Sequence, residues 1–454
     1  MRKLLIANRG EIAVRIIRTA RAMGIATVVV CSEADRDSLA ARSADEAVVV
    51  GPPPAPASYL NQQAILDAAR VTGADAVHPG YGFLSENADF AKRVIGSGLT
   101  WVGPDPDAIR LMGDKAAALQ AARGAGVPVL AGSDGPLPSD ADGDDALAVA
   151  RGIGFPLVIK AAAGGGGRGI RLAREEAEFA GTLGLARSEA KSSFGDDTVY
   201  LERFVDRARH VEVQILGDGS RFVHLGDRDC TMQRRSQKII EEAPAPLLPD
   251  AVRDRIRDSS VALARACGYS GVGTVEFLYD PAREEVAFIE MNTRLQVEHP
   301  VTEMITGLDL VAEQLRIADG EPLGWTQDDI MLTGHAFECR INAEDPARGF
   351  FPSPGQITKL TWPEGPGIRV DTGFEQGSVV TPFYDSMIAK LVVHAPARDE
   401  AIELMATALS QLTVEGIATT AGLQQTLFGS PELARVEHYT TFIETAPGIL
   451  EVTT

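Results

Sequence analysis

The chain has 454 residues, which is enough for about three domains with large buried cores. Its 63 acidic residues outnumber its 43 basic ones and give a formal net charge of −20. A surface this acidic repels nucleic-acid phosphates and anionic membranes, so neither is an expected partner. It also repels anionic substrates, so a site for such substrates must gather cations of its own.

The cysteines and the N-terminus indicate where the protein works. Cys31, Cys230, Cys267 and Cys339 are widely spaced and form no C-x-x-C pair, which fits a reducing compartment better than a disulfide framework. The apolar run from Leu4 to Ala7 is too short for a signal-peptide core, and no apolar stretch has the length of a membrane span. We expect a cytoplasmic protein.

The first hundred residues alternate between strand and helix patterns. Residues 3–8 and 27–31 read as buried strands around a helix whose apolar stripe runs from Ile12 to Met23. The pattern continues with a strand at 47–50, a helix at 61–70, a strand at 74–78 and a helix at 86–95. This βαβ order predicts a doubly wound parallel sheet that ends near residues 105–111.

After about residue 111 the chain no longer alternates regularly between strand and helix patterns. Residues 132–144 are a loop by composition, followed by a helix, a strand ending at Lys160, a glycine-rich loop and another helix. Strands near 198–203, 209–216 and 221–226 have no long helices between them, which predicts an inserted α+β lobe. A third region starts near 335, with strands at 335–341, 367–371 and 387–394 and a helix at 398–411. The fold class is α/β and α+β.

The glycine-rich loop reads KAAAGGGGRG over residues 160–169. Consecutive glycines let backbone N–H groups approach a ligand closely and form a cradle for phosphate. The segment lacks the GK[ST] ending of a Walker loop, and as a dinucleotide-binding motif it is weak because it opens no early βαβ unit. A flexible linker explains the glycines equally well, but Lys160 at the end of the strand favours phosphate binding.

Two strand-like segments carry carboxylates where a core sheet prefers apolar side chains. Glu276 interrupts the run 273–280, and Glu290 and Asn292 share a face of 286–292 because strand side chains alternate. A carboxylate buried on a sheet is costly unless it is paired or binds a metal. Hard oxygen ligands of this kind suit Mg²⁺ held with substrate phosphates. The alternative is that both glutamates face solvent at a sheet edge.

The next residues continue this polar pattern. Arg294, Gln296 and Glu298 have the same parity as Glu290 and Asn292, so an extended chain directs all five toward one side. A guanidinium is a bidentate partner for a planar oxyanion such as bicarbonate, and a nearby carboxylate is suited to act as its general base. A surface ladder of salt bridges is the alternative.

Further cations follow the same logic. Lys238 and Arg235 lie in QRRSQKIIEE (233–242), a segment that reads equally well as an exposed charged loop. Arg340 lies on a strand among apolar neighbours and therefore needs an anionic partner. HPGYGFL (78–84) is a turn-rich loop after a strand, where open α/β sheets bind ligands, although it also fits a simple tight turn.

Taken together, these segments resemble the biotin carboxylases. The resemblance rests on the glycine loop and the QRR-x-QK segment, together with IANRGEIA (6–13), HPGYGFLSEN (78–87), MGDK (112–115), RHVEVQ (209–214), EEAPAP (241–246), EMNTRLQVEHPVTEMITG (290–307) and ECRINAED (338–345). It runs from the first strand to the 380s and weakens toward the C-terminus. It implies a Rossmann-like domain over 1–114, an ATP-grasp domain over 115–334 with a mobile lobe at about 131–204, and a C-terminal domain over 335–454.

The resemblance also implies roles for individual residues. ATP is bound by Lys115, Lys160, Gly165, Gly166, Gly167, Glu202, Arg203, Phe204, Val205, His210, Gln233 and Ser236. Two Mg²⁺ or Mn²⁺ ions are held by Glu276, Glu290 and Asn292. Bicarbonate is bound by Lys238, Arg294, Gln296, Val297 and Glu298, with Glu298 as its base, and Arg340 stabilises the enolate-like form of biotin.

Two positions depart from the family pattern. Position 236 is serine where many members have histidine or another larger residue, and position 203 is arginine where lysine is common. Both lie at the edge of the nucleotide, so they bear on ATP affinity and not on the reaction.

The expected function is carboxylation of biotin through carboxyphosphate. The chain lacks an M-K-M biotin-attachment motif, so we expect either that the biotin is on a separate carrier protein or that this chain is an excised part of a longer polypeptide. Carboxyltransferase subunits are expected as further partners, and a homodimer is the family's usual state. The acceptor suggested is acetyl-CoA or another acyl-CoA. Alternatives are a pyruvate- or urea-type biotin-dependent carboxylase, a different ATP-grasp ligase, or a nucleotide sensor without catalysis.

Overall fold

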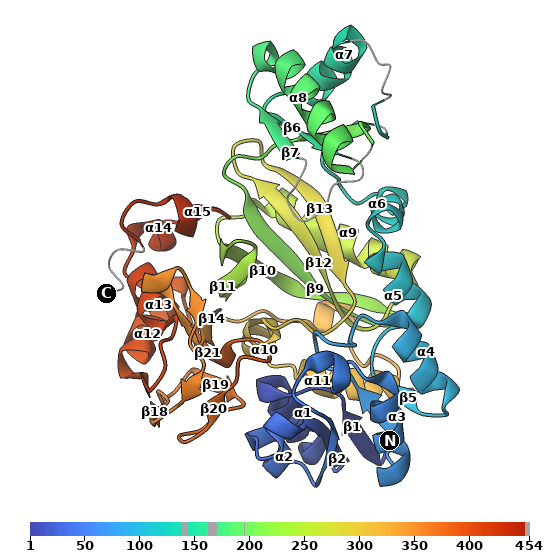
Figure 1. Ribbon diagram of the computed structural model, residues 1–454, viewed down its shortest axis with the longest axis vertical. Helices are drawn as coiled ribbons and strands as arrows, with labels where there is room; N and C mark the ends of the chain where they lie inside the picture. The colour runs from blue at the N-terminus through green and yellow to red at the C-terminus, as the bar shows by residue number, and fades with distance from the viewer. Residues whose placement is uncertain (134, 138–142, 162–169, 195, 450–454) are drawn as a thin grey trace. The chain divides into compact units, whose positions relative to one another are not determined.

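The computed structural model describes residues 1–133, 135–137, 143–161, 170–194 and 196–449 (Figure 1). The chain forms two compact units. The larger unit combines Met1–Val127, Arg209–Tyr279 and Phe288–Thr454, and the smaller one combines Pro128–Ala208 with Asp280–Ala287. Within the described residues, every helix is too short or too polar to cross a membrane.

The N-terminal part of the larger unit is a five-stranded parallel sheet in the order β3-β2-β1-β4-β5. This confirms the predicted doubly wound arrangement. The strands are β1 (Lys3–Ile6), β2 (Ala26–Ser32), β3 (Glu46–Gly51), β4 (Ala76–His78) and β5 (Thr100–Trp101). The helices are α1 (Gly10–Ala22), α2 (Leu39–Ser43), α3 (Gln62–Thr72), α4 (Ala88–Gly96), α5 (Pro106–Gly113) and α6 (Lys115–Gly124).

The helices of this part form for local reasons that the sequence carries. Ile12, Ile16 and Ile17 of α1 are buried, as the predicted apolar stripe requires. α3 ends at Gly73, which adopts the left-handed conformation that glycine tolerates best. α6 begins directly after Asp114, whose carboxylate accepts bonds from the amides of Ala116 and Ala117, each at 2.9 Å. This cap places Lys115 at the exposed start of α6.

An eight-stranded sheet forms the rest of the larger unit's framework, in the order β13-β12-β9-β10-β11-β14-β21-β19. Its strands are β9 (Arg209–Asp218), β10 (Phe222–Arg234), β11 (Gln237–Ala243), β12 (Ser270–Asp280), β13 (Glu285–Asn292), β14 (His335–Asn342), β19 (Ile368–Thr372) and β21 (Met387–Ala395). The strands after residue 335 thus continue the sheet begun by β9. Short pairs complete the strands: β15 (Glu344–Asp345) with β16 (Phe351–Pro352), β17 (Gly355–Gln356) with β20 (Val379–Val380), and β18 (Lys359–Thr361) with β22 (Thr413–Glu415).

The large sheet has helices on both faces. α12 (Arg398–Gln411) and α13 (Ala421–Phe428) pack against β14 over a core that includes Phe337, Cys339 and Leu391. α10 (His299–Thr306) packs against β11, β14 and β21. The remaining helices of the unit are α9 (Asp250–Ala266), α11 (Leu310–Ala318), α14 (Pro431–Ala434) and α15 (Phe442–Thr445).

The smaller unit has a three-stranded antiparallel sheet in the order β7-β6-β8, with two helices. Its elements are α7 (Gly143–Ile153), β6 (Leu157–Ala161), β7 (Ile170–Ala173), α8 (Glu176–Phe194) and β8 (Val199–Arg203). Leu157, Ile159 and Leu201 are in its core. This unit has the predicted α+β character, but of the three strands predicted for the lobe only the one near 198–203 belongs to it. The strands predicted near 209–216 and 221–226 are β9 and β10 of the large sheet, because they pair with each other and with β12 and β11.

One local prediction is wrong. The extended run expected from Glu290 to Glu298 ends at Asn292, where β13 stops. The chain then turns, and Glu298 becomes the residue that precedes the first turn of α10, a helix that has Pro300 near its start. Proline favours a helical start, so Pro300 fits the beginning of α10, and the alternation of side chains had already ended where the chain left the sheet after Asn292.

Candidate active site

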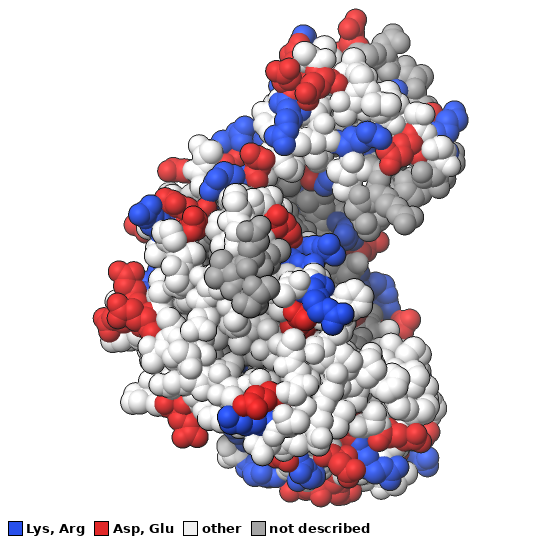
Figure 2. All heavy atoms as spheres, turned by 60° about the vertical axis from the view of Figure 1, so that its left-hand side comes forward, with Lys and Arg blue, Asp and Glu red and all other residues white. Residues whose placement is uncertain are grey.

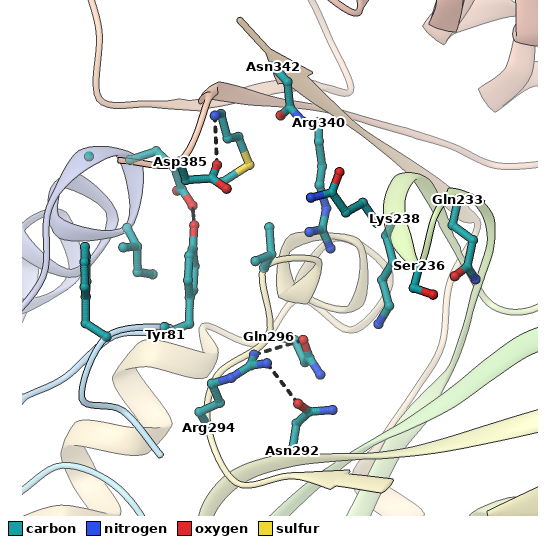
Figure 3. A pocket seen from close by; sticks show the side chains of 18 of the residues that line it. Tyr81, Gln233, Ser236, Lys238, Asn292, Arg294, Gln296, Arg340, Asn342 and Asp385 are labelled. Carbon is teal, nitrogen blue, oxygen red and sulfur yellow. Dashed lines mark hydrogen bonds between the residues drawn. The ribbon is translucent and has the colours of Figure 1, made fainter. Parts of the chain in front are cut away.

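A pocket in the larger unit collects most of the predicted site residues. Its cavity volume is about 830 Å³, and its walls come from the loops after β1 and β4, from β10 to β14, and from the segment 383–387 (Figure 3). Arg9, Lys238, Arg294 and Arg340 line it. Acidic and basic side chains are interspersed on the face drawn in Figure 2. The pocket thus gathers the cations that an anion site requires in a chain of net charge −20.

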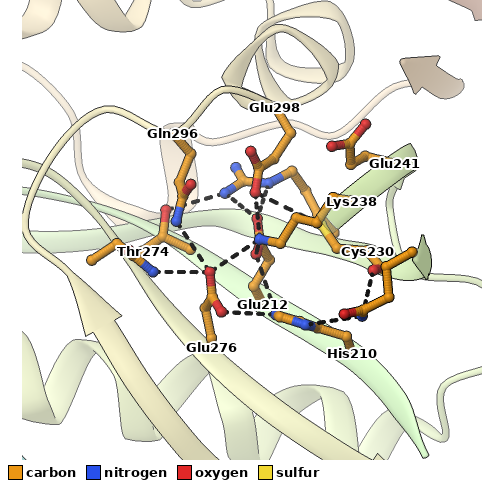
Figure 4. A network of polar contacts seen from close by, with 12 residues as sticks. His210, Glu212, Cys230, Lys238, Glu241, Thr274, Glu276, Gln296 and Glu298 are labelled. Atoms are coloured by element: carbon orange, nitrogen blue, oxygen red, sulfur yellow. Dashed lines mark hydrogen bonds and ion pairs between the residues drawn. The ribbon is translucent and has the colours of Figure 1, made fainter. Parts of the chain in front are cut away.

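Lys238 lies at the centre of a buried polar network (Figure 4). Its Nζ donates to Glu212 Oε2 at 2.6 Å, to Glu276 Oε1 at 3.0 Å and to Glu298 Oε1 at 2.6 Å. β11 positions this lysine just after a two-residue hairpin turn in which Arg235 and Ser236 both have positive φ, as such turns require. One ammonium group is therefore shared by carboxylates from β9, β12 and the start of α10.

Glu298 and Arg340 form the second part of the network. The Arg340 guanidinium donates from Nη2 to Glu298 Oε2 at 2.8 Å and from Nε to Glu241 Oε1 at 2.5 Å. Burial alone would raise the pKa of Glu298, but Lys238, Arg340 and Arg228 outweigh burial and hold that pKa well below its usual range. The carboxylate of Glu298 is therefore ionised, and the anionic partner predicted for Arg340 is confirmed.

Arg294 is held from three sides. Its Nε donates to Glu86 Oε2 at 2.9 Å, Nη2 to Asn292 Oδ1 at 2.9 Å and Nη1 to Gln296 Oε1 at 3.1 Å (Figure 3). Glu86 also accepts the backbone N–H of Thr293 at 3.2 Å. The guanidinium is thereby fixed at the pocket wall, and the turn after β13 brings together side chains that a straight strand would have spread apart.

The three predicted metal ligands divide between buried and exposed positions. Glu276 is buried and Asn292 donates to its Oε1 at 2.9 Å, whereas Glu290 is exposed on the edge strand β13. All three line the same pocket. Burial alone would raise the pKa of Glu276, but Lys238 and His210 hold it well below its usual range. Two carboxylates and a carboxamide on one wall are a donor set that suits Mg²⁺.

Val297 presents its backbone to a buried lysine. The carbonyl of Val297 accepts from Lys390 Nζ at 2.9 Å, and Lys390 also lies 3.1 Å from Glu11 Oε1. Lys390 is completely buried. Glu11 in turn accepts from the hydroxyl of Tyr81, which lines the pocket together with Val297. The loop between β13 and α10 is thus tied to the N-terminal sheet.

The residues predicted for ATP fall into three groups. His210, Gln233 and Ser236 line the pocket, and Lys115 lies on the exposed start of α6 in the same unit. Lys160, Glu202, Arg203, Phe204 and Val205 belong to the smaller unit. There Lys160 Nζ donates to Glu202, and Arg203 pairs with Glu285 at 2.7 Å. Gly165, Gly166 and Gly167 lie outside the described residues.

The sequence of this chain also matches known proteins. Three family models match consecutive segments: "Biotin carboxylase, N-terminal domain" over residues 1–109, "Carbamoyl-phosphate synthase L chain, ATP binding domain" over 114–326 and "Biotin carboxylase C-terminal domain" over 338–445. The biotin carboxylase of Pseudomonas aeruginosa is 53% identical over 428 residues, which cover 94% of each chain. The chain belongs to the biotin carboxylase family.

Solved structures of biotin carboxylases share the fold. The biotin carboxylase domain of a thermophilic 2-oxoglutarate carboxylase, bound to ADP, superimposes with a TM-score of 0.93 at 44% identity over 99% of both chains. The corresponding domain dimer from Hydrogenobacter thermophilus, in complex with MgADP, ADP and bicarbonate, gives a TM-score of 0.86 at 44% identity over 99% of this chain and 98% of that one. The chain is an ATP-dependent carboxylating ligase with an ATP-grasp fold.

Sequence reasoning missed four residues that hold this biotin carboxylase network in place. They are Glu86, Glu212, Arg228 and Glu241. Glu212 and Arg228 are fully buried and bond to each other at 2.7 Å from neighbouring strands β9 and β10. The alternation of charged and apolar residues in RHVEVQ was an available signal for Glu212. Glu86 and Glu241 act only through long-range contacts, which one sequence does not reveal.

For Arg235 the structure favours the exposed charged loop, one of the two predicted alternatives. Its side chain is exposed at the hairpin turn and is not part of the pocket wall, whereas Lys238, three residues later, is. Position i+1 of a two-residue hairpin turn lies at the outer end of the hairpin, so its side chain is directed away from the sheet's interior.

Proposed function

We propose that this enzyme carboxylates biotin on a separate carrier protein, using ATP and bicarbonate, as the first half-reaction of an acyl-CoA carboxylase. The observation that carries the proposal is the position of Glu298. It is a fully buried carboxylate held by Lys238 and Arg340, two cations that line the pocket. Two cations at the wall of a pocket are suited to bind an oxyanion, and the acid held between them is suited to accept its proton.

Glu298 is the proposed general base for bicarbonate. In the arrangement described above, Lys238 and Arg340 stabilise its ionised form and so make it a weak base. An incoming anion competes for the same two cations. Each contact that Lys238 or Arg340 gives to the anion raises the pKa of Glu298 toward its ordinary value, so binding of the substrate itself activates the base.

The chemistry then proceeds in two transfers. A bicarbonate oxygen, freed of its proton by Glu298, attacks the γ-phosphorus of ATP, and ADP leaves. Carboxyphosphate breaks into CO₂ and phosphate, phosphate takes the N1 proton of biotin, and N1 bonds to CO₂. Arg294, Gln296 and the Val297 backbone hold bicarbonate, and Arg340 donates to the biotin oxygen that gains negative charge.

The residues predicted to bind the nucleotide are the proposed ATP ligands. We propose phosphate contacts for Lys115, Lys160 and Gly165–Gly167, and contacts to the rest of the nucleotide for the segment 202–205 with His210, Gln233 and Ser236. Glu276, Glu290 and Asn292 are the proposed holders of two Mg²⁺ or Mn²⁺ ions. Bound Mg²⁺ supplies neutralisation of the charge that develops on the phosphoryl oxygens.

The partners and the domain limits are proposals as well. The 2-oxoglutarate carboxylase relative from Hydrogenobacter thermophilus is described as a dimer, and we propose a homodimer here, with a carrier protein and carboxyltransferase subunits as partners. The segments 1–114, 115–334 and 335–454 are proposed as domains, with a mobile lobe at about 131–204. Affinity capture of the biotinylated partner tests the acyl-CoA assignment, because a pyruvate- or urea-type carboxylase would bring a different partner.

Substitution of Glu298 tests the proposed function directly. Glu298→Gln keeps the shape of the side chain but cannot accept the proton, so bicarbonate-dependent ADP formation should fall by about 10²–10⁴-fold. Binding of ATP, measured by calorimetry, should change little. Turnover near the unaltered level would overturn the general-base assignment.

Glu303→Gln is the matched control. Glu303 is a buried acid on the same helix, bonded to Arg15 and Arg369 at 2.7 Å each, and neither of these arginines lines the pocket, unlike Lys238 and Arg340. We expect this variant to lose stability but to keep its turnover per folded molecule. Equal losses of turnover in the two variants would mean that α10 is merely damaged in both.

A further inference from the structure

Two buried glutamates face each other beside Arg340. Glu241 on β11 and Glu338 on β14 are directly paired in the antiparallel register, and both are fully buried. Directly opposed side chains on neighbouring strands have Cβ atoms about 4.5–5.5 Å apart, which is within reach for two carboxyl groups. Glu338 also has the same parity on β14 as Arg340, so both side chains point to the face that α10 covers.

The carboxyl groups of Glu241 and Glu338 both have oxygens without a hydrogen-bond partner among the described residues. Glu241 uses Oε1 to accept from Arg340 Nε at 2.5 Å, and its Oε2 is buried without a hydrogen-bond partner among the described residues. Within the same described part of the chain, neither oxygen of Glu338 has a partner either. An ionised carboxylate is an acceptor only, so two of them offer nothing to each other, whereas a protonated one has a donor to give.

The local charges favour one protonated carboxyl. Around Arg340, the buried acids outnumber the cations that meet them. The acids are Glu11, Glu212, Glu241, Glu276, Glu298 and Glu338, and the permanent cations are Arg228, Lys238, Arg340 and Lys390. His210 lies 2.9 Å from Glu276 and adds at most one more positive charge, so the acids still outnumber the cations. Burying an ionised carboxylate without a hydrogen bond is far more costly than neutralising it. The acid without any bond, Glu338, is the natural holder of the proton.

We propose that Glu338 is a neutral acid that donates its proton in a hydrogen bond to Glu241 Oε2, so that the two carboxyls act as one anion that fixes Arg340. The pKa directions agree with this arrangement. Burial raises the pKa of Glu338 well above its usual range, against the opposing effect of Lys390, and burial raises the pKa of Glu241 to about 7.

This pair gives Glu338 a positioning role, which rests on the proposed function of Arg340. Glu241 holds Nε and Glu298 holds Nη2, so the plane of the guanidinium is set by two carboxylates. Glu338 does not touch the pocket; it occupies the second oxygen of Glu241 and so keeps Glu241 turned toward Nε. Arg340 then meets the developing charge on biotin without reorganising, which is where preorganised donors have their value.

Infrared spectroscopy of the full-length protein tests the protonation without any assay of activity. The unaltered protein should show the carbonyl band of a protonated carboxylic acid, and that band should shift in D₂O and be missing from Glu338→Gln. A spectrum in which the two proteins have the same carboxylic-acid bands means that Glu338 is ionised, held for example through buried water, and the proposal fails. This outcome is independent of whether the enzyme carboxylates biotin.

Kinetics of two Glu338 variants test the positioning. Glu338→Gln keeps a donor for Glu241 and should retain biotin-dependent turnover within about threefold, because the hydrogen bond is preserved. Glu338→Leu removes the donor and should lower that turnover by about tenfold or more, since the second oxygen of Glu241 is then left buried without a partner. Equal turnover in both variants, at equal folded fractions, overturns the positioning role. If Glu338→Leu does not fold, the infrared comparison alone decides.

Discussion

The two faces of strand β14 are both buried, yet they differ completely in chemistry. Phe337, Cys339 and Ile341 point into the apolar core under α12 and α13. The residues between them, Glu338 and Arg340, point to the opposite face, which α10 covers. Burial alone therefore does not separate structure from function in this protein.

The difference shows what each face does for the molecule. Apolar side chains gain free energy when they leave water, whereas a buried ion pair roughly cancels its own desolvation cost and is weak evidence for stability. The apolar face therefore holds the sheet together. The charged face, with Glu241, Glu298 and Lys390 around Arg340, instead fixes the guanidinium of Arg340 at the pocket wall.

The largest expected effect is on stability at the apolar face. Phe337 is fully buried and packs edge-on against Phe428. Phe337→Ala should lower the free energy of unfolding by about 3–5 kcal/mol, because it leaves a cavity in a packed core. Denaturant unfolding measures the loss, and turnover per folded molecule should stay within about twofold. A variant of normal stability and poor turnover would reverse the roles of the two faces.

A loss of turnover is expected from the charged face. Arg340→Lys keeps the positive charge but loses the planar fork that joins Glu241 and Glu298. Biotin-dependent ADP formation should fall by about 10²-fold, which is typical for removing one donor to a developing oxyanion. Arg369→Lys is the control, since Arg369 lies on the same face, pairs with Glu303 and is absent from the pocket wall. Equal losses of turnover in the two variants would contradict a special role for Arg340.

His78 on β4 is a titratable residue that is buried in its uncharged form, which sets it apart from the ion pairs on the charged face of β14. Burial lowers the pKa of His78 to about 3, so the folded protein keeps this ring neutral while the unfolded chain binds a proton below about pH 6.5. Stability due to His78 is therefore complete above pH 6.5 and lost as the pH falls. Between pH 6.5 and 5 the loss is about 2 kcal/mol.

His78→Asn should remove that loss. Asparagine retains an acceptor for the N–H of Gly80, which His78 Nδ1 receives at 3.0 Å. Urea unfolding at a series of pH values should show that the free energy of unfolding falls less steeply with decreasing pH in the variant than in the unaltered protein. An equal pH dependence of the free energy of unfolding in the two proteins would show that His78 does not contribute to it.

The smallest effect is expected at the hairpin turn. Arg235 is exposed and lies outside the pocket wall, so Arg235→Ala should change the KM for ATP and for bicarbonate by less than about twofold, with stability within about 0.5 kcal/mol. Its neighbour in sequence, Lys238, bonds three carboxylates. A large rise in KM for Arg235→Ala would show that charge at a distance steers the substrates.

Periodic patterns in the sequence predicted the fold well. The parallel sheet of β1 to β5, the α+β character of the smaller unit and the helix at 398–411 all follow from apolar spacing and turn residues. These signals are local, so one sequence contains them. The joining of β14, β21 and β19 to the sheet of β9 was not predicted, because the link is the pairing of β11 with β14, and pairing between strands so far apart in the chain leaves no local signature.

The candidate site was predicted in part. Lys238, Arg294 and Arg340 were recognised as cations that need anions, and each has them. The five-residue register from Glu290 to Glu298 was wrong because the chain leaves the sheet after Asn292, yet Asn292, Arg294 and Gln296 still bond in a chain. Glu241 and Glu338 were invisible in the sequence, since their importance comes only from facing each other across two strands.

The most direct test of the account follows the oxygen of bicarbonate. If Glu298 activates bicarbonate to attack ATP, one bicarbonate oxygen becomes the bridge of carboxyphosphate and stays with phosphorus when CO₂ leaves. With ¹⁸O-labelled bicarbonate, ATP and biotin, the inorganic phosphate should carry one labelled oxygen, as mass spectrometry would show. Phosphate that draws its new oxygen from water would mean that ATP is simply hydrolysed, and the proposed role of Glu298 would be contradicted.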